Sequence, residues 1–266
     1  MGSEMCIRDS IWRDREKIMD LVELITGNRV ISAYNTIGGV RRDIDSDKAD
    51  KIRKVLLKVE EEWKEYKKTW MEDPTITRRT MGVGILKPRD ALKYCVVGPV
   101  LRGSGVKSDV RKDDPYEVYG DIPFNVVTYD TCDSWARYMV RVDEILESIN
   151  IILYALDNLP QGEIRRPLVR RLPEAEAFAK TEAPRGELVY HLYSKGGFKP
   201  YRLKVRTPTF ANILGATIMF KGERIADIAL IFLSCPPIKW YANSERLYLS
   251  LGSKNALLPL LISKRL

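Results

Sequence analysis

The sequence has few of the residues that build disulfide frameworks or metal centres. It contains four cysteines and one histidine in 266 residues, and no two cysteines form a Cys-x-x-Cys pair. This spacing argues against a disulfide scaffold and a self-contained iron–sulfur site. No apolar run approaches the roughly 20 residues that cross a bilayer, and Met81–Leu86 has GxG but not the GxGxxG of dinucleotide-binding loops. We expect a globular chain in a reducing, cytoplasmic setting that does not itself bind a nicotinamide dinucleotide.

The charge is basic, with 44 Lys and Arg against 36 Asp and Glu and a formal net charge of +8. This excess favours an anionic neighbour or is simply that of a basic globular protein. Aromatic residues are not interleaved with the basic ones as in RNA-binding modules, so nucleic acid is not expected as a partner. A chain of this length can bury about three quarters of its unfolded surface, which is enough for one large core or two closely joined units.

Hydrophobic periodicity predicts three long helices, over residues 11–25, 47–70 and 131–158. The last has the widest apolar stripe and is predicted to be the central helix of a bundle. On it, Arg137 and Arg141 lie within one turn of carboxylates, and salt bridges are the expected interaction. The following segment, Pro160–Arg185, is rich in proline and charge and is predicted to be a surface excursion.

A β-hairpin is predicted after this segment. Val189–Tyr193 is β-prone, Ser194–Phe198 supplies a Lys-Gly-Gly turn, and Tyr201–Arg206 alternates apolar with basic residues. This alternation predicts one buried face, with Tyr201, Leu203 and Val205, and one basic face, with Arg202, Lys204 and Arg206. The basic row is either solvated or docks a partner.

Polar residues suited to a functional site flank the hairpin. Glu187 has Arg185 and Arg206 near it in sequence or across the predicted strands, and a carboxylate between guanidiniums stays ionised and can relay charge. A salt-bridge network that holds the hairpin is an equal alternative. The single histidine, His191, is expected to be structural.

Several long motifs in this chain resemble one family. They are Thr26–Asp43 (TGNRVISAYNTIGGVRRD), Arg79–Gly84 (RTMGVG), Gly98–Arg111 (GPVLRGSGVKSDVR), Arg137–Ser148 (RYMVRVDEILES), Ala183–Glu187 (APRGE) and Lys204–Asn212 (KVRTPTFAN). In this order and spacing they resemble the large catalytic-core subunit, the D or 49-kDa subunit, of respiratory complex I. They are equally similar to the large subunits of membrane-bound nickel–iron hydrogenases.

The resemblance implies an α+β fold, mainly a helical bundle with small antiparallel sheets and hairpins, like that of nickel–iron hydrogenase large subunits. It implies a subunit of an NADH (or other donor):quinone oxidoreductase, peripheral on the cytoplasmic face of the membrane and inactive alone. The expected partners are a small iron–sulfur (B-type) subunit carrying an adjacent [4Fe-4S] cluster, a C-type subunit and membrane-arm subunits. Quinone is the substrate, and no cofactor or metal is expected on this chain alone.

The resemblance also implies which residues lie at the site. Those expected to act most directly are Glu187, Arg185 and Arg206. Those expected to line the quinone cavity or the cluster interface are Gly38, Gly39, Arg41, Arg102, Ser104, Gly105, Thr207 and Asn212. From spacing alone, the Gly38–Gly39 turn and the Gly98–Val110 loop would be a plain turn and a surface loop. The His and Tyr that the family uses for quinone fall upstream of this chain.

Two other functions stay open. A hydrogenase large subunit needs two Cys-x-x-Cys pairs as soft ligands for nickel and iron, and this chain has none. For that function, one pair would lie upstream of this chain and the other would be altered downstream. A non-catalytic scaffold subunit would lack both those cysteines and the upstream His and Tyr.

Both ends of the sequence differ from the family pattern. Met5–Ser10 (MCIRDS) back-translates to ATG TGT ATA AGA GAC AG, which resembles a sequencing-library adaptor, so residues 1–10 are predicted to be a non-native leader. Residues 11–234 form the predicted family domain. Pro236 stands where the family has aspartate, and residues 235–266 are either a frame error or a genuinely divergent tail.

Overall fold

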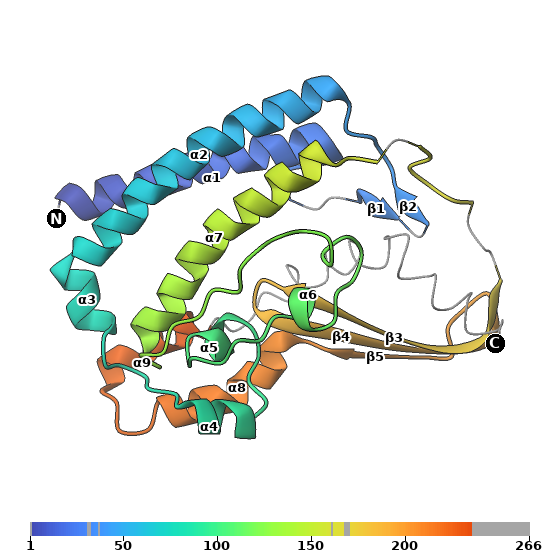
Figure 1. Ribbon diagram of the computed structural model, residues 1–266. Coiled ribbons are helices and arrows are strands. Elements are labelled where there is room, and N and C mark those ends of the chain that lie inside the picture. Colours follow the sequence, from blue (N-terminus) through green and yellow to red (C-terminus); the bar gives the residue numbers. More distant parts are fainter. Residues whose placement is uncertain (1, 31–32, 37, 161, 168–170, 236–266) are drawn as a thin grey trace.

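The computed structural model describes residues 2–30, 33–36, 38–160, 162–167 and 171–235. In this part of the chain a layer of long helices lies beside an antiparallel sheet, and shorter helices lie below the long ones (Figure 1). The predicted α+β class is confirmed. The domain limits stay predictions, and all of the predicted tail beyond Cys235 lies outside the described residues.

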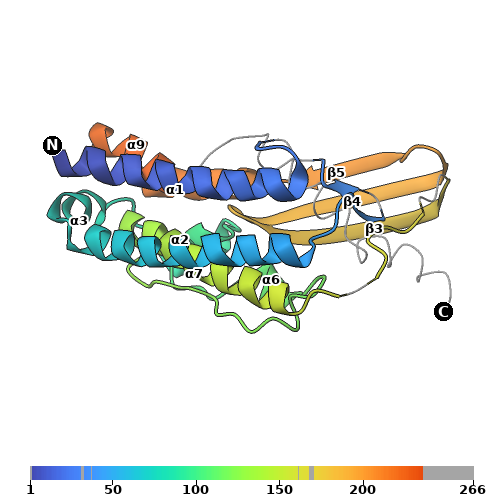
Figure 2. The same cartoon turned by 90° about the horizontal axis from the view of Figure 1, so that it is seen from above.

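Three long helices form the helical layer. They are α1 (Gly2–Thr26), α2 (Ser46–Glu72) and α7 (Ser134–Asp157), and α2 contacts both of the others (Figures 1 and 2). Apolar side chains from all three build a shared core, formed by Leu21, Ile52, Leu56, Val59 and Ile149. The periodicity therefore predicted all three helices correctly, although α1 begins nine residues before the predicted start.

Side-chain caps and one long-range bond fix these helices. The Asp45 carboxylate accepts a hydrogen bond from the Lys48 amide (2.8 Å), and that of Asp133 accepts one from the Ala136 amide (2.9 Å). Each bond satisfies an amide that the first turn leaves without a helical partner. The Trp63 Nε1 donates to the Val142 carbonyl at 2.9 Å, which joins α2 to α7.

The sheet has three antiparallel strands in the order β3 (Leu172–Ala183), β4 (Gly186–Gly197) and β5 (Arg202–Arg206). Val189 faces Arg206 in the register, so the predicted pairing of the two hairpin strands is confirmed. The turn comes later than predicted, because Ser194–Gly197 continues β4 and pairs with β3. A second, two-stranded ribbon pairs β1 (Asn35–Thr36) with β2 (Gly39–Val40). In Figure 1 the three-stranded sheet extends to the right from beside α6 and α8, which contact β3 and β4 respectively.

Two predictions about the sheet are wrong. The segment Pro160–Arg185 is not a surface excursion throughout, because twelve of its residues form β3 and pair with β4. The apolar side chains of β5 and of the residue before it are not buried: Tyr201 is 62%, Leu203 51% and Val205 45% exposed. β5 is an edge strand, and no described element covers its apolar face. The alternation of apolar and basic residues therefore predicted the strand but not the burial of its apolar side chains.

The remaining described helices are shorter. They are α3 (Pro74–Thr80), α4 (Pro88–Lys93), α5 (Pro99–Arg102), α6 (Val110–Asp113), α8 (Pro208–Met219) and α9 (Ile225–Ser234). Helices α4, α5, α8 and α9 and the loops beside them form a second core. The core residues are Leu86, Ala91, Val96, Val100, Leu101, Ala216, Met219, Ile231 and Cys235. This core holds the Gly98–Val110 loop against α8 and α9. Among the described helices, none combines the length and the apolar character that crossing a bilayer requires.

The α2 stripe gives a direct test of this packing. Leu56 is 3% exposed, whereas the next residue, Leu57, is 46% exposed. Leu56→Ala should lower the free energy of unfolding by about 2–5 kcal/mol, because it leaves a cavity among three helices. Leu57→Ala should change it by only about 0.5 kcal/mol. Urea unfolding of the full chain measures both, and equal losses would contradict the described orientation of α2.

Candidate functional site

The turn between β3 and β4 contacts the start of α5 through two glycines. Gly98 (φ +69°) and Gly186 (φ +122°) have backbone angles that other residues rarely adopt. A Cβ on Gly98 would lie 2.3 Å from the Gly186 Cα, and one on Gly186 would lie 2.7 Å from the Gly98 nitrogen. The two backbones therefore touch where the family-like APRGE motif meets the Gly98–Val110 loop.

Asn212 connects this contact to α8. Its side chain is buried, its Oδ1 accepts a hydrogen bond from the Val97 amide (2.9 Å), and its Nδ2 donates to the Arg185 carbonyl (3.2 Å). Thr207, the residue that precedes α8, is half-buried. The structure thus brings together the turn, the loop and the helix that the sequence motifs indicated.

The predicted carboxylate–guanidinium pair is present on the hairpin. Arg206 Nη1 lies 2.7 Å from Glu187 Oε1, with the two side chains 42% and 25% exposed. Arg185 takes part through its carbonyl, and burial lowers the pKa of its guanidinium. Glu187 is therefore held by Arg206 at the edge of the site, and its role there stays a prediction.

Arg102 is the centre of a buried charge network. Its guanidinium contacts Glu144 (2.6 Å), Glu182 (3.0 Å) and Asp109 (3.6 Å), and it also donates to the Ser108 carbonyl (2.9 Å). The four charged side chains lie deep in the protein, with exposures of 2% for Arg102, 1% for Asp109, 5% for Glu182 and 19% for Glu144. The network joins α5, α7, β3 and the start of α6.

Burial and ion pairing oppose each other in this network. Burial would lower the pKa of Arg102, but Glu144, Glu182 and Asp109 raise it overall. Burial would raise the pKa of Asp109, but Arg111 at 2.6 Å and Arg102 lower it. For Glu182, burial outweighs the attraction of Arg102 and, together with the charge of Asp109, raises the pKa to about 7. Burial raises the pKa of Glu144 as well.

The other two predicted members of the Arg102 loop have local roles. Ser104 is fully buried, and its Oγ donates to the Val100 carbonyl at 3.3 Å. Gly105 is exposed and has a φ of +79°, which allows the loop to turn. The loop is therefore not the flexible surface loop that spacing alone would favour.

The predicted salt bridges of Arg137 and Arg141 are not formed within the described residues. Arg137 is fully buried and donates to the Gly84 carbonyl (2.8 Å) and to the hydroxyls of Ser134 and Ser234 (both 2.9 Å). Arg141 donates to the Ser234 carbonyl at 2.7 Å. The nearby carboxylates are engaged elsewhere, since Asp133 caps α7 and Glu144 pairs with Arg102. Burial lowers the pKa of Arg137 to about 10.

The Gly38–Gly39 turn is held by a different segment. The Arg166 amide donates to the Gly38 carbonyl (2.9 Å), and the Val40 amide donates to the Ile164 carbonyl (3.0 Å). Gly39 also pairs with Arg165, and Arg41 is exposed. The described contacts of this turn therefore run to residues 164–166, and its predicted place at the cavity stays untested.

Sequence reasoning missed the carboxylates of the Arg102 network. Glu182 directly precedes the APRGE motif, and Asp109 caps α6. Glu144 lies on α7, and only its charge, on a helix with a wide apolar stripe, could have marked it as a candidate. Alternation and periodicity could not show that three separate segments bring their acids to one arginine.

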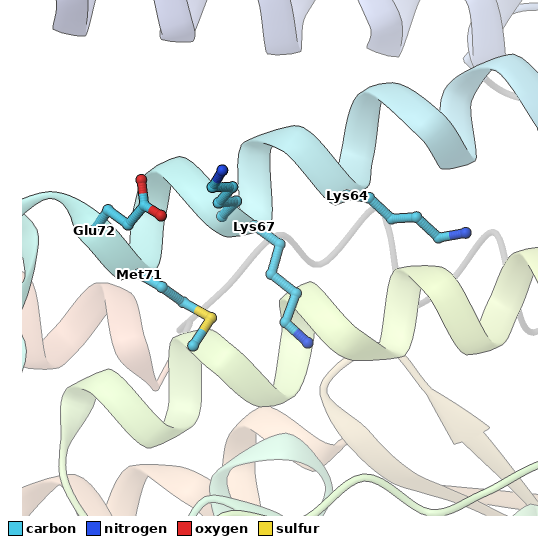
Figure 3. A pocket seen from close by; sticks show the side chains of 5 residues that line it. Lys64, Lys67, Met71 and Glu72 are labelled. Carbon is cyan, nitrogen blue, oxygen red and sulfur yellow. The ribbon is translucent and has the colours of Figure 1, made fainter.

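A surface depression of about 490 Å³ lies elsewhere, along one side of α2. Its lining residues are Lys64, Lys67, Lys68, Met71 and Glu72, and Figure 3 shows Lys67 and Met71 pointing toward α7. Lys67 pairs with Asp143 at 2.6 Å and Lys64 with Glu60 at 2.5 Å. The depression is therefore a groove beside one helix and includes no residue of the candidate site.

Residues 4–170 and 168–239 match the family described as respiratory-chain NADH dehydrogenase, 49-kDa subunit. The chain belongs to this family. It is 40% identical over 217 residues to the D subunit of the NADH-quinone oxidoreductase of Desulfotalea psychrophila, covering 80% of this chain and 58% of that protein. It is 42% identical over 224 residues to a carbon monoxide-induced hydrogenase of Rhodospirillum rubrum, covering 84% and 62%.

A solved structure has the same fold. A chain of the membrane-bound sulfane sulfur reductase, an archaeal respiratory membrane complex, superposes with a TM-score of 0.80 at 33% identity. The match covers 88% of this chain and 65% of that chain. The predicted fold, like that of the 49-kDa and hydrogenase large subunits, is confirmed. The chain spans less than two thirds of the length of each of these relatives.

The residues present do not fit a nickel–iron centre. Such a centre needs four thiolates, and the 266 residues contain no Cys-x-x-Cys pair. Among the residues with described placement, Cys95, Cys132 and Cys235 are free thiols, and no group of three or more His, Cys, Asp or Glu is arranged to hold a metal ion. The ligand set that hydrogen chemistry requires is therefore not provided by these residues.

The glycine contact at the site gives a second test. Gly186→Ala should lower the free energy of unfolding by at least about 2 kcal/mol, because the new Cβ meets backbone atoms and the φ is unfavourable. Gly222 (φ +87°) has open space around it, so Gly222→Ala should cost only about 1 kcal/mol. Equal costs in urea unfolding would show that the turn and the loop do not touch.

Proposed function

We propose that this chain is a catalytic-core subunit of a membrane-associated NADH (or other donor):quinone oxidoreductase. The proposal rests on family membership together with one structural observation. The APRGE turn, the Arg102 loop and the start of α8 meet at a single polar junction, tied by Asn212 and by the Gly98–Gly186 contact. These are three of the motifs that carry the family resemblance.

In this function the subunit walls a cavity for the quinone headgroup. The [4Fe-4S] cluster of a small iron–sulfur partner would supply the electrons, and reduction of the quinone to a quinol takes up two electrons and two protons. Glu187, Arg185 and Arg206 lie at the polar edge of the junction, where a carboxylate paired with a guanidinium can relay charge. This chain supplies polar groups and shape, and the partner supplies the redox centre.

Exposed apolar side chains support docking of partner subunits. Phe210 is 75% and Leu214 53% exposed on α8, and Leu233 is 65% exposed on α9. With the uncovered apolar side of β5 they leave much nonpolar surface near the junction, as expected of a subunit that is buried in a larger assembly. Partners of the B, C and membrane-arm types would place the subunit at the cytoplasmic face of the membrane.

The second candidate is a hydrogenase large subunit. One observation favours it, the 42% identity to a carbon monoxide-induced hydrogenase. The 266 residues, which cover 62% of that hydrogenase, do not themselves supply its metal ligands, since they contain no Cys-x-x-Cys pair. A third candidate, a scaffold subunit, has no observation of its own in its favour.

Isolation of the native complex through this chain separates the candidates. We expect co-purification of a small iron–sulfur subunit, reduction of a soluble quinone by the complex with a physiological donor, and no nickel by elemental analysis. Nickel together with hydrogen evolution from a reduced donor would contradict the quinone function and establish the hydrogenase. A complex with neither activity would indicate a scaffold.

A further inference from the structure

The Arg102 network contains more acids than bases. At distances below 4 Å, two guanidiniums, Arg102 and Arg111, serve three carboxylates, Asp109, Glu144 and Glu182. Asp109 contacts both arginines, so Glu144 and Glu182 share the one cation Arg102. A buried carboxylate without its own counter-ion is costly to keep ionised, and a bound proton removes that cost.

The register of the hairpin adds a second reason. Glu182 of β3 lies directly opposite Glu187 of β4, and one further pair, Ala183 and Gly186, separates them from the turn. Residues that face each other across antiparallel strands point to the same side of the sheet, with Cβ atoms about 5 Å apart, and like charges there are destabilising. Glu187 is already paired with Arg206, so Glu182 is the member of the pair that gains from being neutral.

The two glutamates also differ in access to solvent. The Glu182 side chain is 5% exposed and that of Glu187 is 25% exposed. The backbone amide of Glu182 donates to the Tyr116 Oη at 3.2 Å, and its Oε2 accepts from the Val110 amide at 3.3 Å. Glu182 is thus held in place by backbone and side-chain contacts, and its neighbour across the strands reaches the surface.

Other charged and titratable groups lie on the elements that carry the network and on those next to them. They are Asp113 and Arg111 on α6, Arg141 on α7, Lys180 with its partner Asp114 beside β3, Glu187 and Arg206 on β4 and β5, and the phenols of Tyr116 and Tyr119. Arg141 acts on Glu144 only at longer range, because its described hydrogen bond goes to Ser234. The cation that contacts Glu182 directly is Arg102.

We propose that this network is a proton-holding site, in which Glu182 carries one exchangeable proton and Glu187 connects it to solvent. Deprotonation breaks the O–H bond of the Glu182 carboxyl and leaves a carboxylate on Arg102. The raised pKa of Glu182, caused first by burial, agrees with this assignment.

The use of that proton rests on the proposed function. Reduction of a quinone to a quinol consumes two electrons, from the partner's iron–sulfur cluster, and two protons. Glu182 lies one residue before the APRGE turn and is suited to supply one of these protons, after which Glu187 returns a proton from solvent. In this role Glu182 supplies a proton to the site without touching the quinone itself.

Carbon-13 NMR of the full chain labelled at the glutamate carboxyl carbons tests the site without any turnover. One glutamate signal should titrate with a midpoint near 7, where Glu182 is expected, and it should be missing in Glu182→Gln but kept in the control Glu174→Gln, an exposed residue of the same strand. If Glu182→Gln does not fold, the titration of the unaltered chain decides alone. Titration of every glutamate near the ordinary value of about 4.3 would overturn the proposal.

Stability against pH gives a second readout with a defined sign. Because the pKa of Glu182 is raised in the folded state, its contribution to stability is largest at low pH and is lost as the pH rises through about 7. The melting temperature of the unaltered chain should therefore fall relative to that of Glu182→Gln between about pH 4.5 and pH 7. A constant difference across this window would contradict a proton on Glu182.

Turnover of the assembled complex tests the use of the proton separately. Glu182→Gln should lower kcat for quinone reduction about tenfold or more with little change in KM, since proton supply and not binding is affected. An unchanged kcat and pH profile would overturn proton delivery. If the unaltered complex reduces no quinone, the proposed function fails, while the NMR midpoint still decides whether Glu182 holds a proton.

Discussion

The buried guanidinium of Arg102 is the interaction on which the arrangement of the site depends. A charge in the interior is tolerated only when partners replace its lost hydration, and removal of one partner from a buried pair costs about 3–5 kcal/mol. Here the partners come from α7, from the segment before α6 and from β3. The need to satisfy one side chain therefore brings three separate parts of the chain to one place.

The backbone around Arg102 supports the same arrangement. Gly103 lies against α7, where a Cβ would be 2.7 Å from the Arg137 Cγ, and Gly98 lies against Gly186 in the hairpin turn. Glycines on both sides of α5 thus let it approach a helix and a turn at once. Arg137 and Arg141 extend the junction to α9 through Ser234, by bonds to carbonyls and hydroxyls instead of carboxylates.

Much of the fold could be predicted from the sequence, because local signals and tertiary structure agree there. The apolar stripe of α2 and the wide stripe of α7 predicted long helices that the structure confirms. The β-prone run Val189–Tyr193 and the alternation of Tyr201–Arg206 predicted the pairing of β4 with β5. Strand β3 was missed, since its alternating Glu, Ala and Lys residues have low strand propensity and form a strand through pairing with β4. The predicted burial of the apolar face of β5 was wrong for a related reason. A strand at the edge of a sheet buries that face only if another element packs on it, and the sequence of the strand does not specify such an element.

The candidate site was predictable only in part. The motifs marked Arg185, Glu187, Arg206 and Asn212, and the structure joins Glu187 to Arg206 and Asn212 to Arg185. Long-range pairing of Arg102 with Glu144 and Glu182 could not be inferred, because the members lie 42 and 80 residues away along the chain. Spacing within α7 instead suggested Asp133 and Glu144 as partners of Arg137 and Arg141. In the structure Asp133 caps α7 and Glu144 pairs with Arg102, so neither is available.

Amide hydrogen exchange in the full chain and in Arg102→Met tests the central role of Arg102 most directly. Methionine keeps an unbranched side chain of similar length but removes the charge. If one guanidinium holds the junction together, the variant should exchange faster at the start of α6, in α7 around Glu144 and in the turn between β3 and β4, all together, with α1 unchanged. Faster exchange confined to α5 would contradict this account and would show that the three segments are held in place independently.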